Sequence, residues 1–218
     1  MPSSPLVPTA VFVSGSGTNL QAVIDATMAG SLPLDLRLVV SDNPSAFALE
    51  RAAKSGIPTH VDVWRRSVES RAAYGARLAS AVSARGVRLV LLLGWMHVLA
   101  KEFLDAGFDG VLNLHPAYLP DDPAADVAAL PDGTTVKAFR GARALRDAIE
   151  ARVPVTGATL IAITPEIDRG AVLARRTFAL RPGEDEAQAL ERLHPVEQEV
   201  VREGISTWIA RHARAMTT

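Results

Sequence analysis

The sequence contains no cysteine, few aromatic residues (5%) and no long apolar run. Without cysteine, disulfide bonds, thiolate zinc sites and cysteine nucleophiles are all excluded. The longest apolar stretch, around 89–93, is far too short to span a bilayer, and the first residues lack the charged start and apolar stretch of a signal peptide. We therefore expect a soluble protein of the cytoplasm.

A strong charge of either sign is also lacking, since the net charge is −1. Nothing in this balance indicates a nucleic-acid or membrane partner, although a local nest of backbone N–H groups can hold a phosphate without net positive charge. The 218 residues, 48% apolar and 22% charged, are typical of one globular domain. We expect a single domain over residues 1–218.

Strand-like apolar runs alternate with longer helical patterns in the first half. We expect strands at 9–14, 36–40, 60–63, 89–93 and 110–114, and helices at 19–29, 47–55 and 67–85. This alternation predicts an α/β fold, a Rossmann-like and mostly parallel sheet flanked by helices. Ligands of such sheets bind beyond the carboxyl ends of the strands, which here means just after Val13, Leu93 and Leu114.

The second half has a different pattern, which predicts an antiparallel extension of the sheet. The expected elements are a helix at 142–151, a hairpin-like pair of strands at 156–163 and 172–179, and a helix at 184–212. Pro195 should kink or divide that last helix. Residues 121–137 have little pattern and several Asp, Pro and Gly residues, so we expect a surface loop or lid there.

A glycine-rich turn, residues 14–19, follows the first strand and opens the first helix. Glycines allow a sharp turn and a close approach of backbone to ligand, and a helix start favours anions. The third glycine of the dinucleotide fingerprint is missing, because Leu20 stands at its place. The local pattern fits a phosphate site and an ordinary turn, capped by Thr18 or Asn19, equally well.

Asn113 and His115 lie two residues apart near the end of the last strand of the first half, so they point the same way. A histidine can act as a general acid or base, and an amide can donate to a developing oxyanion. They fit a catalytic site and a braced loop about equally. The loop 164–170 reads as a turn by itself, but a carboxylate from it placed near His115 would orient the ring. Residues 93–99 fit an apolar cleft for a flat ring or ordinary core.

Taken together, these stretches resemble the phosphoribosylglycinamide formyltransferase family. The matching segments are 11–22, with Gly15, Gly17, Thr18, Asn19, Leu20 and Gln21, then 41–43, 94–96, 113–116 and 168–170, in the family's order. The Asn-x-His-Pro element and the later Asp-x-Gly are shared by the wider superfamily that uses formyltetrahydrofolate. The opening Gly-x-Gly-Thr-Asn-Leu-Gln is more specific to the glycinamide ribonucleotide branch.

The resemblance implies an enzyme that transfers a formyl group from the cosubstrate 10-formyltetrahydrofolate to the amine of 5'-phosphoribosylglycinamide in de novo purine biosynthesis. It implies small-molecule partners, no metal, and a nucleotide-binding half at about 9–115 beside a folate and catalytic half at about 116–212. The sequence leaves open whether the chain is a monomer or a homodimer. The residues implied are Asn113, His115 and Asp168 for catalysis; Gly17, Thr18, Asn19, His194 and Glu197 for the ribonucleotide; and Arg71, Trp95, Met96, His97, Val98, Leu99 and the stretch 162–168 with Thr164 and Asp168 for the folate.

Two departures from the family pattern bear on the substrate. Ile161 stands where the family usually has a second histidine, and the segment 121–137 looks inserted before the next helix. Arg140 replaces a usual proline and Arg143 a frequent histidine. The acidic residues of the segment would repel an anionic substrate if they faced it; they are Asp121, Asp122, Asp126 and Asp132.

These departures keep two alternatives open. One is a 10-formyltetrahydrofolate hydrolase or a formyltransferase acting on another amine, which the glycine-rich turn argues against. The other is a non-catalytic homologue that binds phosphate or folate, which Ile161 favours and the set Asn113, His115 and Asp168 disfavours.

Overall fold

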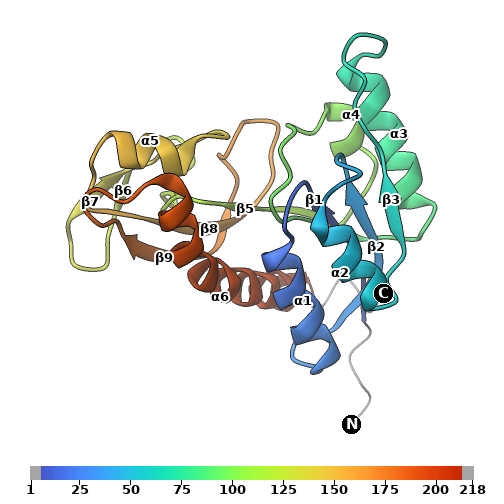
Figure 1. Ribbon diagram of the computed structural model, residues 1–218, viewed down its shortest axis with the longest axis horizontal. Helices are drawn as coiled ribbons and strands as arrows, with labels where there is room; N and C mark the ends of the chain where they lie inside the picture. The colour runs from blue at the N-terminus through green and yellow to red at the C-terminus, as the bar shows by residue number, and fades with distance from the viewer. Residues whose placement is uncertain (1–5, 213–218) are drawn as a thin grey trace. The chain divides into compact units, whose positions relative to one another are not determined.

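The computed structural model describes residues 6–212 (Figure 1), and the chain divides into two compact units after Leu112. We describe each unit by itself. Within the described residues, no helix is both long and apolar enough to cross a membrane.

The first unit is built from alternating strands and helices. Its elements are β1 (Val7–Val13), α1 (Thr18–Met28), β2 (Leu34–Ser41), α2 (Phe47–Lys54), β3 (Thr59–Val61), α3 (Arg71–Ser83), β4 (Leu89–Leu92) and α4 (Lys101–Leu104). The strands run parallel in the order β3-β2-β1-β4. Almost every residue of β1 and β4 is buried, as expected of strands covered on both faces.

Helix α3 begins later than its apolar pattern indicates. Ser70 ends the preceding turn in an extended conformation, and its hydroxyl accepts a hydrogen bond from the Ala73 N–H at 3.1 Å. This contact satisfies one of the free N–H groups of the first turn, so the helix begins at Arg71.

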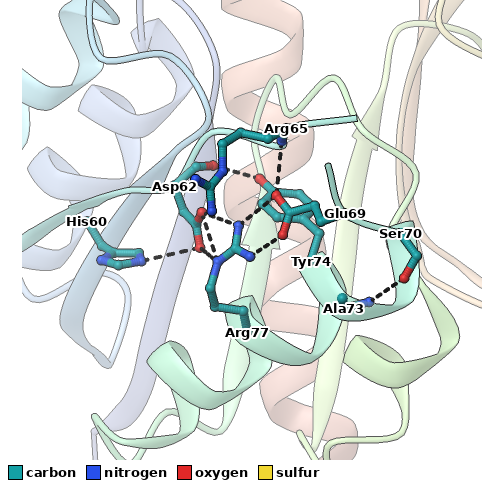
Figure 2. Close-up of polar contacts among 8 residues, drawn as sticks. All are labelled: His60, Asp62, Arg65, Glu69, Ser70, Ala73, Tyr74 and Arg77. Atoms are coloured by element: carbon teal, nitrogen blue, oxygen red, sulfur yellow. Dashed lines mark hydrogen bonds and ion pairs between the residues drawn. The ribbon is translucent and has the colours of Figure 1, made fainter. Parts of the chain in front are cut away.

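The turn before α3 is held by one arginine and two carboxylates (Figure 2). The Arg77 guanidinium donates to both carboxylate oxygens of Asp62, at 2.8 and 3.0 Å. It also donates to both oxygens of Glu69. Hydrogen bonds from Arg77, and from the Arg65 N–H, lower the pKa of Glu69 from 4.5 to about 2. The Tyr74 hydroxyl donates to the Asp62 carbonyl at 2.7 Å, so α3 fixes the chain on both sides of the turn.

Strand β5 (Gly110–His115) carries the chain across the boundary between the units. The second unit continues with β6 (Val127–Ala129), β7 (Thr135–Lys137), α5 (Ala144–Glu150), β8 (Val155–Ala162), β9 (Val172–Ala179) and α6 (Glu186–His212). β8 and β9 pair antiparallel, which confirms the predicted hairpin-type extension. α6 packs on this pair, and Gly204 lets it approach so closely that a Cβ there would lie 2.5 Å from the Leu160 side chain.

The structure corrects one expectation for this unit and the division proposed in another. The segment 121–137 is not a structureless loop, because β6 and β7 pair antiparallel within it. α6 is not divided at Pro195, and the helix runs through that exposed position without interruption. Buried residues on both sides of the proline, among them Leu193 and Val200, pack the helix onto the unit, and tertiary packing of this kind outweighs one missing backbone hydrogen bond.

Candidate active site

The glycine-rich turn of the first unit depends on Gly17. This residue precedes α1 with φ 71°, a left-handed conformation that glycine adopts without steric cost. A Cβ at Gly17 would lie 2.6 Å from the Ala48 Cβ, so a side chain is also excluded by the neighbouring helix. The turn therefore delivers Thr18 and Asn19 as the first residues of α1, the end of a helix that favours anions.

The carbonyl oxygens of residues 14–16 each accept a hydrogen bond from the protein. The donors are the Asn43 side-chain amide at 3.2 Å, the Ala48 N–H at 3.1 Å and the Arg51 guanidinium at 2.9 Å. These contacts engage the negative ends of the peptide dipoles, and Arg51 adds a positive charge beside the turn. Both effects favour an anion at the start of α1.

The segment after β4, residues 94–99, is partly core and partly exposed. Trp95 is buried and meets the Phe12 ring edge-on, with 4.9 Å between centroids, so the core interpretation holds for this residue. Met96 and Val98 are 59% and 48% exposed. Exposed apolar side chains at the carboxyl end of a buried strand fit the flat ring of a ligand.

Arg71 is the first residue of α3, and its guanidinium lies 5.5 Å from the centroid of the Trp64 ring. It is exposed, as a residue expected to meet the charged tail of a folate should be.

In the second unit, Asp168 contacts both of the side chains that end β5. Its Oδ1 accepts from the Asn113 amide at 3.4 Å, and its Oδ2 lies 3.5 Å from His115 Nδ1. The structure thus brings together the three residues expected to be catalytic. His115 is 3% exposed, and the side chain of Asp168 is 10% exposed.

The second ring nitrogen of His115 has an acceptor as well. Nε2 lies 2.8 Å from the Phe139 carbonyl oxygen, and a carbonyl only accepts, so Nε2 carries a proton. An oxygen atom thus faces each ring nitrogen. The ring is therefore held by protein groups on both sides.

The Asp168 loop is fixed by backbone geometry that few sequences allow. Asp168 has φ 52°, and a Cβ at Gly170 would lie 1.5 Å from the Ala162 carbonyl oxygen. The Gly141 N–H donates to Asp168 Oδ2 at 2.7 Å, and Arg140 Nε donates to the Asp168 carbonyl at 3.2 Å. The sequence placed Phe139, Arg140 and Gly141 at a junction beside the active site and Arg140 as an attraction for an anion, but it gave no sign of their contacts with His115 and Asp168.

The acidic residues of the segment 121–137 have partners within the second unit. Asp126 pairs with Arg140 at 2.9 Å and Arg169 at 3.1 Å. The other contacts are Asp121 to Arg175 at 2.6 Å, Asp122 to the Ala124 N–H at 2.9 Å, and Asp132 to the Thr134 N–H at 2.9 Å. These contacts reduce the repulsion that the segment would exert on an anion.

Ile161 lies on β8 and is 1% exposed. It packs with Leu119, Ala138 and Val172, all apolar. The surroundings match the isoleucine, which packs into a local apolar cluster.

Three further expected residues also belong to the second unit. His194 and Glu197 lie on α6, Glu197 buried and His194 half-buried, and burial lowers the pKa of His194. Thr164 is exposed in the turn between β8 and β9, where its hydroxyl donates to the Glu166 carbonyl at 3.2 Å.

Comparison with known proteins shows the family to which the chain belongs. The family model described as formyl transferase matches residues 8–205, and the chain therefore belongs to the formyl transferase family. Its mixed α/β fold, with a mostly parallel sheet and antiparallel strands, is that of glycinamide ribonucleotide transformylase 1 from Symbiobacterium toebii, at 32% identity, a TM-score of 0.80, and coverage of 92% of this chain and 86% of that one.

Two relatives of this chain carry names that are more specific than that of the family. The phosphoribosylglycinamide formyltransferase of Dictyostelium discoideum is 30% identical over 89% of this chain and 94% of its own. The trifunctional purine biosynthetic protein adenosine-3 of Drosophila melanogaster is 32% identical over 86% of this chain, which spans only 13% of that longer protein.

Proposed function

We propose that this protein transfers a formyl group from 10-formyltetrahydrofolate to the amine of 5'-phosphoribosylglycinamide, a step of de novo purine biosynthesis. One observation carries the proposal: the Asp168 carboxylate contacts Asn113 and His115 at the end of β5. The Dictyostelium relative, which this chain matches over almost its whole length, is named for this activity.

The reaction needs a hydrogen-bond donor that stabilises negative charge and a group that accepts a proton. Attack of an amine on a formyl carbon develops negative charge on the formyl oxygen and leaves a proton to be removed from the nitrogen. The Asn113 amide donates to the oxygen, and the positive charge of His115 stabilises it; one such donor contributes about 3–4 kcal/mol. Collapse of the tetrahedral intermediate breaks the bond between the formyl carbon and the folate nitrogen. Asp168 holds the imidazolium and helps to relay the proton through water from the amine to that leaving nitrogen.

The folate supplies the formyl group when it is bound. We propose that Trp95, Met96, His97, Val98 and Leu99 hold its pterin together with Thr164 and the rest of 162–168, and that Arg71 meets its charged tail. The exposed apolar side chains of Met96 and Val98 support this assignment. No step of the proposed transfer calls for a metal ion, because side chains carry both the charge and the proton.

The phosphate of the second substrate would bind at the start of α1. The satisfied carbonyl groups of residues 14–16 and the nearby Arg51 support Gly17, Thr18 and Asn19 in this role. His194 and Glu197 are proposed to contact the rest of the ribonucleotide.

A hydrolase that releases formate is the second candidate. His115 has protein acceptors on both nitrogens, an arrangement that also suits activation of a water by the neighbouring carboxylate. The glycine-rich turn favours the transferase, since hydrolysis of the folate alone uses no phosphate-bearing substrate.

The test follows tetrahydrofolate release from 10-formyltetrahydrofolate by absorbance, with and without 5'-phosphoribosylglycinamide. We expect release only when the glycinamide substrate is present. Release of equal rate without it would establish a hydrolase. Absence of release in both mixtures, with folate binding retained in calorimetry, would identify a binding protein or a transferase to a different amine.

A further inference from the structure

The stretch 41–43 at the carboxyl end of β2, which we term the β2 tripeptide, touches both binding segments of the first unit. Ser41 is fully buried and fixes the turn: its hydroxyl donates to the Asn43 carbonyl at 3.0 Å and accepts from the Asn43 N–H at 3.1 Å. The two residues that follow Ser41 are therefore held in one orientation. Their side chains reach different partners.

Asn43 reaches the glycine-rich turn. Its amide nitrogen donates to the Ser14 carbonyl at 3.2 Å, and its amide oxygen accepts from the Ser45 N–H at 2.9 Å. The amide is thus used on both sides and ties the first residue of the turn to the tripeptide.

Asp42 reaches the segment after β4. Its Oδ2 lies 2.9 Å from His97 Nε2, and the two side chains are only 12% and 18% exposed. Trp64, Tyr74 and Trp95 surround the His97 ring, each nearly perpendicular to it, with centroids 5.6–6.3 Å away. This packing leaves the ring little freedom to rotate.

The other nitrogen of His97 determines which protons it carries. Nδ1 lies 3.5 Å from Arg66 Nη2, and a guanidinium only donates. In the tautomer that suits this contact, Nδ1 accepts from Arg66 and Nε2–H donates to Asp42. The carboxylate thus sets both the tautomer and the orientation of His97.

We propose that the β2 tripeptide holds two positioning residues with separate targets. Asn43 positions the glycine-rich turn, and Asp42 positions residues 95–99 by fixing His97. The identity of the ligands at these segments rests on the proposed function, but the separation of the two effects does not. Loss of either contact changes the affinity for one substrate and leaves the other unaffected.

The test compares kinetic constants of Asp42→Ala and Asn43→Ala with those of the unchanged protein. We expect Asp42→Ala to raise the KM for 10-formyltetrahydrofolate about tenfold, since a charge-assisted hydrogen bond is lost, and to leave the KM for the glycinamide substrate within about twofold. Asn43→Ala gives the reverse pattern. A parallel rise of both KM values in each variant, or no change in either, overturns the proposal.

Two conservative variants guard against general loss of structure. Asp42→Asn keeps an acceptor for the Nε2–H of His97, so it should restore most of the folate affinity. Asn43→Asp keeps the acceptor for the Ser45 N–H but loses the donor to Ser14, so it should behave like Asn43→Ala. Asp35→Ala serves as the matched control, because Asp35 also lies on β2 and pairs there with Arg37.

Titration calorimetry with tetrahydrofolate and with inorganic phosphate provides a readout that needs no turnover. Asp42→Ala should weaken the first and Asn43→Ala the second, each by about tenfold. If the unchanged protein binds both probes but transfers no formyl group, the proposed function fails while the positioning proposal is still decided. Equal weakening of both probes by one variant would reject it.

Discussion

At the scale of single residues, Asp168 carries the largest number of contacts at the proposed centre. Its carboxylate accepts from the Gly141 N–H and the Asn113 amide and faces His115. We expect Asp168→Asn to lower kcat by about a hundredfold or more, because the negative charge that holds the imidazolium is lost. The KM for the folate should change far less, since the amide keeps the shape of the side chain.

Steady-state kinetics check this expectation, with Asp147→Asn on α5 as control. That carboxylate is exposed and pairs with Arg143 at 3.4 Å, so its loss should leave kcat unchanged. An unaltered kcat in Asp168→Asn would remove the carboxylate from the mechanism.

Two features exclude a side chain at Gly17, the positive φ and the close neighbour, and substitutions can distinguish their effects. Gly17→Ala meets a left-handed φ of 71° and a neighbour at 2.6 Å, whereas Gly30→Ala meets φ 72° in open space. We expect Gly30→Ala to cost about 1–2 kcal/mol from the backbone alone, and Gly17→Ala a further 1–3 kcal/mol from overpacking.

Urea unfolding measures both free energies, and Gly15→Ala provides the baseline because nothing lies within 4 Å of a Cβ there. Equal losses at Gly17 and Gly30 would mean that α2 yields to the added methyl group.

At the scale of elements, Arg140 and Arg169 tie the residues before β6 to the Asp168 loop, Arg169 through Asp126 and the Pro123 carbonyl. The Arg140 side chain is 14% exposed and donates to Asp126, to the Ala125 carbonyl and to the Asp168 carbonyl. We expect Arg140→Ala to lower kcat by about tenfold or more while the protein stays folded, since displacements of about 1 Å at a catalytic group are costly.

Circular dichroism and kinetics on the same samples test this. Arg146→Ala is the matched control, because Arg146 is exposed and pairs with Glu186 rather than with the Asp168 loop. A drop in thermal stability with full kcat would show that the pair β6–β7 stabilises the unit without positioning Asp168.

The elements that could be predicted are those with strong patterns. The runs of β1 and β4 are apolar throughout, and β8 and β9 flank a turn, so each was visible in the sequence. β6 and β7 are three residues each with one buried side chain apiece, which is too short for any periodicity to stand out. The four-residue α4 was missed for the same reason.

Sequence periodicity also predicted only part of the proposed catalytic centre. Period two predicted that Asn113 and His115 share a side of their strand, and both do contact one carboxylate. Asp168 lies 55 residues from Asn113 along the chain, so only the family resemblance pointed to it. The contacts of Phe139 and Arg140 use a backbone carbonyl and a side chain in an unpatterned stretch, and neither leaves a mark in a sequence.

At the scale of the whole molecule, acid stability should depend on the turn before α3. Glu69 has a pKa of about 2 in the folded chain against 4.5 for the free side chain, so folding favours its charged form. The stability that this pairing contributes is complete above pH 4.5 and is lost as the pH falls toward 2. Wild type should therefore lose more stability on acidification than Glu69→Gln, in which Arg77 has one carboxylate fewer.

Thermal unfolding at about pH 6 and about pH 3 measures the difference. Glu50→Gln is the control, because Glu50 is exposed and lies 4.0 Å from Lys54. Identical pH sensitivity of wild type and Glu69→Gln would show that the pairing with Arg77 does not influence folding.

The apolar cluster around Ile161 constrains the order in which this sequence can change. A histidine introduced there alone would bury two ring nitrogens against Leu119, Ala138 and Val172, none of which has a side chain that can donate or accept. At least one neighbour must first become polar, and that change alone is unfavourable beside isoleucine. Each single step is therefore disfavoured although the pair together is acceptable, so a lineage that has acquired this isoleucine tends to keep it.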